Sequence, residues 1–175
     1  GQFSDVMGGV CAENYGMVRN CSVTGTLTGF RSSQIGALIG RNYGTIYRCQ
    51  ADATVSGRSY IGGLTGYNRG GSIRHSQSIA HVVGDENAEA IGGIAGCNEA
   101  VIEYCHSNVA GEGDFNPTYF SGARWIGGVA GKNEGSIFRS SASGSLYGAD
   151  FYTNAIGGLI GYAKHGEIVE CFSTV

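Results

Sequence analysis

The chain repeats itself six times at intervals of about 30 residues, and this repetition constrains the fold more than any other feature. The starts of the six segments lie 28, 26, 30, 35 and 30 residues apart. A period in this range is typical of stacked supersecondary units, with one unit per repeat. The segments begin at Met7, Ile35, Ile61, Ile91, Ile126 and Ile156, and they read MGGVCAENYG, IGALIGRNYG, IGGLTGYNRGG, IGGIAGCNEA, IGGVAGKNEG and IGGLIGYAKHG.

The second half of each repeat also recurs, and its pattern indicates a β-strand. An aliphatic residue comes first, at Val18, Ile46, Ile73, Ile102, Ile137 and Ile168. Two corner residues follow, and then a cysteine or serine, at Cys21, Cys49, Ser76, Cys105, Ser140 and Cys171. Small or aliphatic residues continue at every second position, which is the period of a strand with one buried face. Because no useful length has helical periodicity, we expect two or three short strands per repeat, joined by corners.

An Asn-x-Gly motif stands between the two halves of several repeats, for example at Asn14 to Gly16 and Asn42 to Gly44. We expect this turn to supply the left-handed backbone positions that a sharp corner needs, and the Gly-Gly pair to mark a second corner. In stacked repeats the asparagines would form a column that caps backbone groups and bonds to itself, and that breaks at Ala163. Its members are Asn14, Asn42, Asn68, Asn98 and Asn133.

These patterns predict an all-β fold, a parallel β-solenoid of six stacked rungs of about 26–35 residues each. One repeat cannot bury its apolar face alone, whereas stacking buries it and pairs strands in parallel at about 4.8 Å per rung. We expect a single domain over residues 1–175, with the isoleucines at the repeat starts in one core column. The chain stops inside an expected strand at Val175, so we also expect a fragment of a larger protein.

Composition excludes several other classes of protein. Glycine accounts for 32 of 175 residues, but no glycine recurs at every third position and proline occurs once, which excludes collagen. With 42% hydrophobic and 14% charged residues, the chain is not typical of disorder. The net charge is -3 and no basic run occurs, so neither nucleic acid nor an anionic membrane is an expected partner. The apolar stretches are also too short for membrane insertion.

The shared signature resembles the GLUG-motif repeat: Ile-Gly-Gly, a further glycine, Asn-x-Gly, an aliphatic residue, then cysteine or serine. The resemblance covers nearly the whole chain, with departures at Ala12, Ala37, Ala100 and Ala163. GLUG repeats occur in bacterial secreted and surface proteins, including IgA-cleaving metallopeptidases and haemagglutinin-like adhesins. The resemblance therefore implies a right-handed β-helix-like solenoid, secreted or on a bacterial cell surface. It does not imply catalysis, because the catalytic parts of such proteins lie outside the repeats.

The six cysteines raise the question of a disulfide or a metal site. Cys21, Cys49, Cys105 and Cys171 share a column with serines, and a small, buried, weakly polar thiol fits that position. We expect these four to be buried and reduced. A Cys21–Cys49 disulfide is the alternative, since stacked Cα atoms fall within disulfide range although the Cβ vectors run parallel. Cys97 stands at a turn position and is expected to be exposed.

Neither a metal nor a cofactor is predicted, because no Cys-x-x-Cys occurs and the histidines fall in different columns. These histidines are His75, His81, His106 and His165.

Polysaccharide-degrading enzymes share the parallel β-helix architecture, so acidic ladders are relevant. Glu99 and Glu134 share one turn column, yet no carboxylate pair with the separation of a glycosidase can be chosen. We therefore expect no catalytic residues and no enzyme activity in this chain by itself. The corner after the aliphatic position carries charges that predict a solvated edge, namely Arg19, Arg48, Arg74, Arg139, Glu103 and Glu170.

The linkers between repeats vary in length, and insertions on one side of a repeat array often build its binding face. They span residues 28–34, 57–60, 84–90, 111–125 and 148–155. The last two are rich in aromatic residues, which either contact a ligand or only cover the flank of the solenoid. The candidate binding residues are Asp114, Phe115, Tyr119, Phe120, Arg124, Trp125, Asp150, Phe151 and Tyr152.

The sequence thus predicts a structural and interaction module of a bacterial secreted or cell-surface protein. Its expected partners are a host protein or glycan, bound through the linkers, and the rest of the parent polypeptide. Two alternatives stay open. One is a carbohydrate-binding module, since aromatic rings beside acids and amides suit sugars. The other is a polysaccharide-degrading enzyme.

Overall fold

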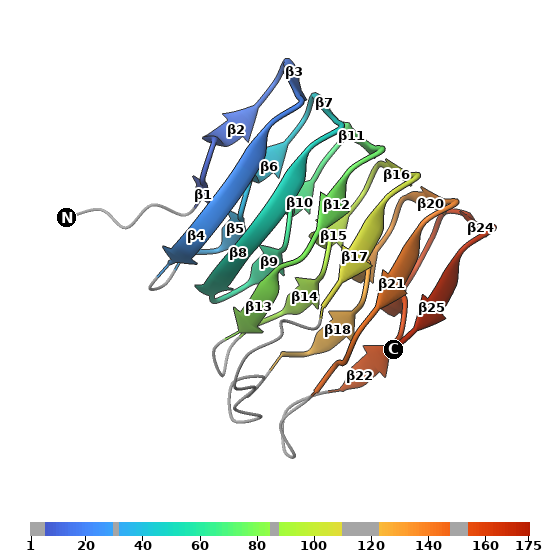
Figure 1. Cartoon of the computed structure of the whole chain (residues 1–175). Coiled ribbons are helices and arrows are strands. Elements are labelled where there is room, and N and C mark those ends of the chain that lie inside the picture. Colours follow the sequence, from blue (N-terminus) through green and yellow to red (C-terminus); the bar gives the residue numbers. More distant parts are fainter. Residues whose placement is uncertain (1–5, 30–31, 85–87, 110–122, 148–153) are drawn as a thin grey trace.

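The computed structural model describes residues 6–29, 32–84, 88–109, 123–147 and 154–175. In these residues each strand pairs in parallel with an equivalent strand of a neighbouring repeat, and the rungs stack in one column (Figure 1). The prediction of an all-β parallel solenoid is confirmed. None of the described residues forms a helix, so they contain no helix long and apolar enough to cross a membrane.

Each rung contributes to four sheets, which we call A to D in chain order. Sheet A consists of β1 (Val6–Gly8), β5 (Gln34–Gly36), β9 (Tyr60–Gly62), β14 (Ala90–Gly92), β18 (Trp125–Gly127) and β22 (Ala155–Gly157). Sheet B consists of β2 (Cys11–Asn14), β6 (Ile39–Asn42), β10 (Thr65–Asn68), β15 (Ala95–Asn98), β19 (Ala130–Asn133) and β23 (Ile160–Ala163). The expectation of two or three strands per repeat was therefore too low, because the Gly-Gly corner divides the first half into two strands.

The second half of each rung supplies the other two sheets. Sheet C consists of β3 (Met17–Arg19), β7 (Thr45–Tyr47), β11 (Ser72–Arg74), β16 (Val101–Glu103), β20 (Ser136–Phe138) and β24 (Ile168–Val169). Sheet D consists of β4 (Ser22–Thr28), β8 (Gln50–Gly57), β12 (Gln77–Ser78), β13 (His81–Gly84), β17 (His106–Asn108), β21 (Ser141–Ser143) and β25 (Phe172–Thr174). Each linker runs from a strand of sheet D to the next strand of sheet A, so all five start and finish along one edge, as predicted (Figure 1).

The core is built from ladders of equivalent residues. Met7 and the five isoleucines of the repeat starts pair in register along sheet A, as the sequence predicts. These side chains point toward sheet D, where a Cβ at Gly57 would overlap the end of Ile35. Ile46, Ile73, Ile102 and Ile137 form the corresponding buried ladder of sheet C.

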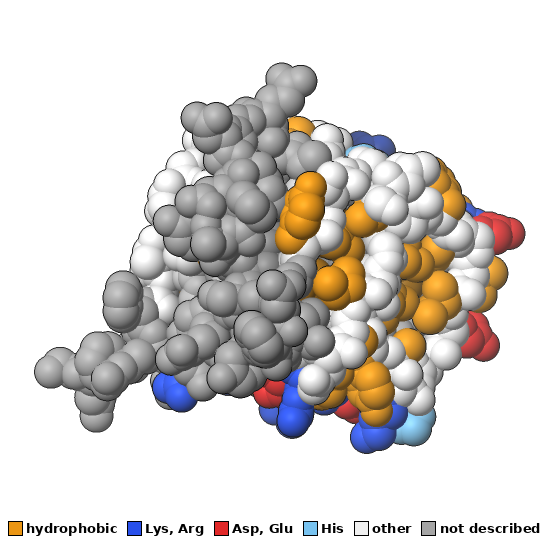
Figure 2. Space-filling model, turned by 90° about the horizontal axis from the view of Figure 1, so that it is seen from below, with side chains coloured by type: hydrophobic (Ala, Val, Ile, Leu, Met, Phe, Trp, Pro, Cys, Tyr) orange, Lys and Arg blue, Asp and Glu red, His pale blue; other side chains and the backbone are white. Residues whose placement is uncertain are grey.

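The two outermost rungs have a neighbouring rung on one side only. Ile156 is therefore 48% exposed although Ile126, one rung below it, is fully buried. Figure 2 shows hydrophobic side chains gathered on this last rung. Its exposed large hydrophobic residues are Ile156, Tyr162, Ile168, Val169, Phe172 and Val175.

The asparagine column forms the hydrogen-bonded ladder that the sequence predicts. The side-chain amide of Asn42 donates to the Oδ1 of Asn68 at 2.9 Å, and Asn68 donates to Asn98 at 2.8 Å. The same kind of bond joins Asn14 to Asn42 and Asn98 to Asn133. The ladder ends at Ala163, which pairs in register with Asn133.

The left-handed corner, however, lies elsewhere than predicted. Gly16, Gly44 and Gly135 of the Asn-x-Gly turns do not have positive φ, although Gly70 of the Asn68 turn does, at 81°. The non-glycine residues with positive φ, among the residues the structure describes, are those just before the cysteine or serine column. They are Asn20, Arg48, His75, Tyr104, Arg139 and Glu170, with φ between 45° and 54°. Gly44 is required instead for close approach, since a Cβ there would overlap the carbonyl oxygen of Gly16 on the rung below.

Candidate binding surfaces

Most of the predicted binding residues fall outside the described part of the chain. Asp114, Phe115, Tyr119, Phe120, Asp150, Phe151 and Tyr152 are in this group. Arg124 and Trp125 are described, and both lie where the fourth linker joins β18. Of the candidate binding residues, only Arg124 and Trp125 can therefore be placed in the structure.

The Trp125 ring lies in a cluster of aromatic and cationic side chains from two rungs. It stacks on the ring of Tyr162 in β23, with centroids 4.8 Å apart and planes 17° apart. The guanidinium carbon of Arg124 lies 5.4 Å from the Trp125 ring centroid, and the ammonium nitrogen of Lys132 lies 5.6 Å from it. Both distances are within the range of a cation–π contact. We call Arg124, Trp125, Lys132 and Tyr162 the Trp125 cluster.

Charge pairing fixes the Lys132 side of this cluster. The Lys132 ammonium lies 2.8 Å from a carboxylate oxygen of Glu134, and this hydrogen bond raises the pKa of Lys132 and lowers that of Glu134. Lys132 therefore remains a cation, held between a carboxylate and an indole ring. Tyr162 is 38% exposed, so the cluster is accessible from solvent.

A second aromatic pair lies on the same two sheets, two rungs away. The rings of Tyr60 in β9 and Tyr67 in β10 have centroids 5.4 Å apart, and the Tyr67 hydroxyl donates to Glu99. Burial, followed by that hydrogen bond, raises the pKa of Tyr67. Sequence reasoning missed Tyr60, Tyr67, Lys132 and Tyr162. The signal was present, since each stands just before the repeat isoleucine or just before the asparagine position.

Cys97 shares the sheet B column of Tyr67 and Lys132, and the structure corrects its expected exposure. It is only 1% exposed, and burial raises the pKa of its thiol to about 12. The position is part of β15 and not of the turn, so the neighbouring rungs cover it.

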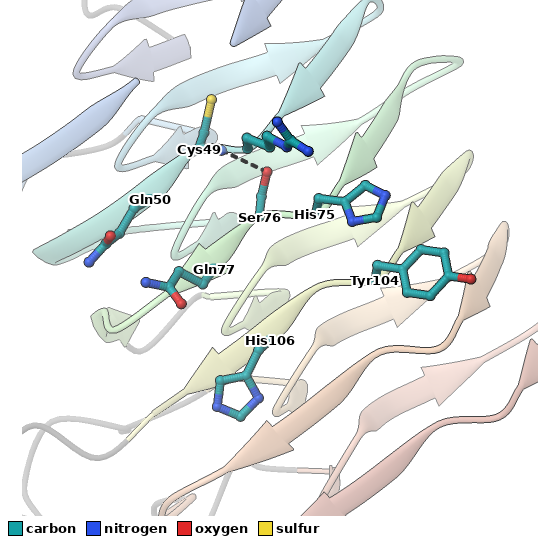
Figure 3. Close-up of a pocket in the computed structure, with 8 residues that line it drawn as sticks. Cys49, Gln50, His75, Ser76, Gln77, Tyr104 and His106 are labelled. Atoms are coloured by element: carbon teal, nitrogen blue, oxygen red, sulfur yellow. Dashed lines mark hydrogen bonds between the residues drawn. The ribbon is translucent and has the colours of Figure 1, made fainter. Parts of the chain in front are cut away.

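On another face, where sheet C turns into sheet D, rungs 2 to 4 border a shallow, open hollow of about 380 Å³ (Figure 3). Buried Cys49 and Ser76 line it together with exposed or half-buried polar side chains. Gln50, Gln77 and His106 are in register on neighbouring strands of sheet D. The other lining residues are the left-handed corner residues Arg48, His75 and Tyr104.

Ring contacts order the corner side of this hollow. The rings of His75 and Tyr104 stack with centroids 4.8 Å apart, and the rings of His75 and Tyr47 form a T-shaped pair with centroids 5.5 Å apart. The guanidinium carbon of Arg139 lies 5.4 Å from the Tyr104 ring centroid. On the other side, the Nδ1 of His106 lies 2.8 Å from the Oγ of Ser141. The solvated charged edge predicted here is present, and its arginines alternate between the two corner columns, with Arg48 in one and Arg74 in the other.

The cysteine and serine column forms the floor of this corner. The Oγ of Ser76 donates to the carbonyl oxygen of Arg74 at 2.8 Å, and the Sγ of Cys105 donates to that of Glu103 at 3.4 Å. All six cysteines are free thiols. Cys49 and Cys105 are buried as predicted, whereas Cys21 and Cys171 are half-buried because they belong to the outermost rungs.

No group of three or more histidine, cysteine or acidic side chains that could hold a metal ion occurs in the residues the structure describes.

Four parallel sheets, in which equivalent residues of adjacent rungs pair with one another, define the chain as a β-solenoid repeat protein. A family model described as the GLUG motif matches residues 6–28, which run from the start of β1 to the end of β4. The match covers the first rung, and the other rungs pair with it in the same register, which supports the resemblance of the chain to GLUG repeats. Comparisons with curated proteins and with solved structures each gave no match.

Proposed function

We propose that the chain is a non-catalytic display and binding module of a secreted or cell-surface bacterial protein. Its partner would bind along the edge where the linkers leave the solenoid. The observation that carries the proposal is the Trp125 cluster, an exposed stack of two aromatic rings flanked by two cations at the root of the longest linker. Tryptophan, tyrosine and arginine are the residue types enriched at binding hot spots.

The surroundings of the acidic residues support a non-catalytic role. Glu103 pairs with Arg74 and Arg139, and Glu134 pairs with Lys132 and Lys164. Glu13, Glu99 and Glu170 also have basic partners. Carboxylates neutralised in this way are poor candidates for a general acid with a raised pKa, as glycoside hydrolysis requires.

The test is a binding assay of the chain on a panel of immobilised host glycoproteins, each presented intact and enzymatically deglycosylated. We expect Trp125→Ala combined with Tyr162→Ala to lower binding to the recognised protein by about 10-fold or more, as for a hot-spot pair. Tyr15→Ala combined with Tyr43→Ala is the matched control. These two rings are also stacked, with centroids 4.7 Å apart, but they lie at a turn on the first two rungs. Equal binding by both double variants would contradict the proposal.

A further inference from the structure

The hollow at the turn from sheet C to sheet D has no role in the proposed function. We propose that it is a binding site for an acidic glycan, whose carboxylate or sulfate group it would hold. The hollow lies on rungs 2 to 4, whereas the Trp125 cluster lies on rungs 5 and 6, so neither proposal depends on the other. The side chains that would contact the ligand are Arg48, Gln50, His75, Gln77, Tyr104 and His106.

The lining of the hollow favours an anion. It contains a guanidinium group, two imidazoles, two amides and a phenol, and no carboxylate is among the lining residues. Arginine binds carboxylate and sulfate-like oxygens through two parallel N–H bonds. The neighbouring Glu103 already lies 3.5 Å from Arg74 and 3.8 Å from Arg139. Asp52 is the other nearby acid, and it is exposed two residues further along β8.

The left-handed corner determines where three of these side chains lie. The corner requires a left-handed conformation, which glycine and asparagine adopt at least cost. Rung 1 has Asn20 at this corner, whereas rungs 2, 3 and 4 have Arg48, His75 and Tyr104 at φ of 51°, 48° and 52°. The same corner holds Arg139 and Glu170 on rungs 5 and 6, so it presents one side chain per rung. On rungs 2 to 4 those side chains lie together at the hollow.

A glycan fits the hollow better than an acidic peptide does. Gln50 and Gln77 are in register, about one rung spacing of 4.8 Å apart. An amide both donates and accepts, as a sugar hydroxyl does. A peptide that adds as a strand needs unpaired backbone groups, but β12 is already paired on both sides, with β8 and β17. A volume of about 380 Å³ is at the small end of ligand sites and suits one or two sugar rings.

The experiment measures, by isothermal titration calorimetry, the affinity of the chain for 3′-sialyllactose, for lactose 3′-sulfate and for lactose. We expect both acidic sugars to bind at least about 10-fold more tightly than lactose, and the difference to shrink with added salt. Arg48→Asn copies the residue of rung 1 at this corner, so the fold should be retained, and its affinity for both acidic sugars should fall about 10-fold or more. Arg58→Asn is the control, because it removes the same charge from an exposed position of the same rung outside the hollow.

Gln77→Glu provides a second variant of nearly unchanged shape. It places a carboxylate in the hollow, so binding of the acidic sugars should be lost while the thermal transition stays unchanged. Three outcomes would overturn the proposal: no saturable binding of either acidic sugar, equal affinity for lactose, or the same loss with Arg58→Asn as with Arg48→Asn. Equal competition by a glutamate-rich peptide would also overturn it and assign the hollow to acidic peptides.

Discussion

Single amide groups hold the turn between sheets B and C. The side-chain nitrogen of Asn42 donates both to Asn68 and to the carbonyl oxygen of Gly44 at 3.0 Å, so one side chain links two rungs and closes its own turn. Because the asparagines are buried, a missing member leaves its neighbours with unsatisfied polar groups. The sequence predicted this column because asparagine recurs at one position in five repeats.

We predict that Asn68→Ala lowers the free energy of unfolding by about 2–4 kcal/mol, because it breaks ladder bonds on both sides. Asn133→Ala should have the smaller effect, since Ala163 follows it in the column. It loses one ladder bond, from Asn98, besides its own bond to the carbonyl oxygen of Gly135. Urea denaturation of both variants measures the difference. Equal losses would show that the ladder does not act through its buried bonds.

The cysteine and serine column leads to a prediction about alkaline pH. Burial raises the pKa of Cys105 to about 12 from its ordinary value of 9. The unfolded chain therefore loses this proton at lower pH than the folded chain. The contribution to stability is intact below pH 9 and decreases as the pH rises from 9 toward 12, by about 1 kcal/mol per pH unit.

Cys105→Ser should change stability by less than about 1 kcal/mol at pH 7, because serines occupy the same column on both neighbouring rungs. Above pH 9 this variant should lose less stability than the wild-type chain. Cys105→Leu should cost about 1–3 kcal/mol through overpacking. If stability fell equally with pH above 9 in the wild type and in Cys105→Ser, the Cys105 thiol would not be the cause of the loss.

At the scale of the element, the strands and turns were predicted less well than the columns. Gly44 and Gly135 of the Asn-x-Gly turns looked like left-handed positions, yet neither has positive φ and both allow close approach between rungs. The corner after sheet C is left-handed with large side chains, which no local propensity indicates. Contacts between rungs determine the backbone conformation of both the Asn-x-Gly turn and the corner after sheet C. Such contacts can be predicted from a sequence only where the residue type repeats.

A glycine-to-alanine substitution can be compared at Gly44, which packs on rung 1, and at Gly16, which has no neighbour within 4 Å of an added Cβ. A Cβ at Gly44 would overlap Gly16, whereas a Cβ at Gly16 meets nothing within 4 Å. Ala100 shows that a methyl group can be accommodated at this position in another rung, where the Val101 N to Gly71 O bond is 3.4 Å long, compared with 2.8 Å for Thr45 N to Gly16 O. We predict that Gly44→Ala lowers the melting temperature by several degrees, equivalent to about 1–2 kcal/mol, and that Gly16→Ala leaves it nearly unchanged.

At the scale of the whole molecule, the period of the repeat was enough to predict the parallel stack, its register and the edge from which the linkers leave. The surfaces could not be predicted in the same way. The hollow joins Arg48, Gln77 and His106, which follow no shared motif and come together because three rungs place them side by side. A period shows which residues are equivalent, but the shape between unlike side chains depends on the folded stack.

The most direct test of the stack is a methyl NOE spectrum of the chain labelled at isoleucine and methionine. Met7, Ile35, Ile61, Ile91, Ile126 and Ile156 should show NOEs in that order, each to its neighbours in the ladder. No NOE should join Ile35 to Ile126, which lie three rungs apart, about 14 Å at 4.8 Å per rung. A contact between these two residues, or none between Ile61 and Ile91, would contradict the one-rung register from which both proposed surfaces are built.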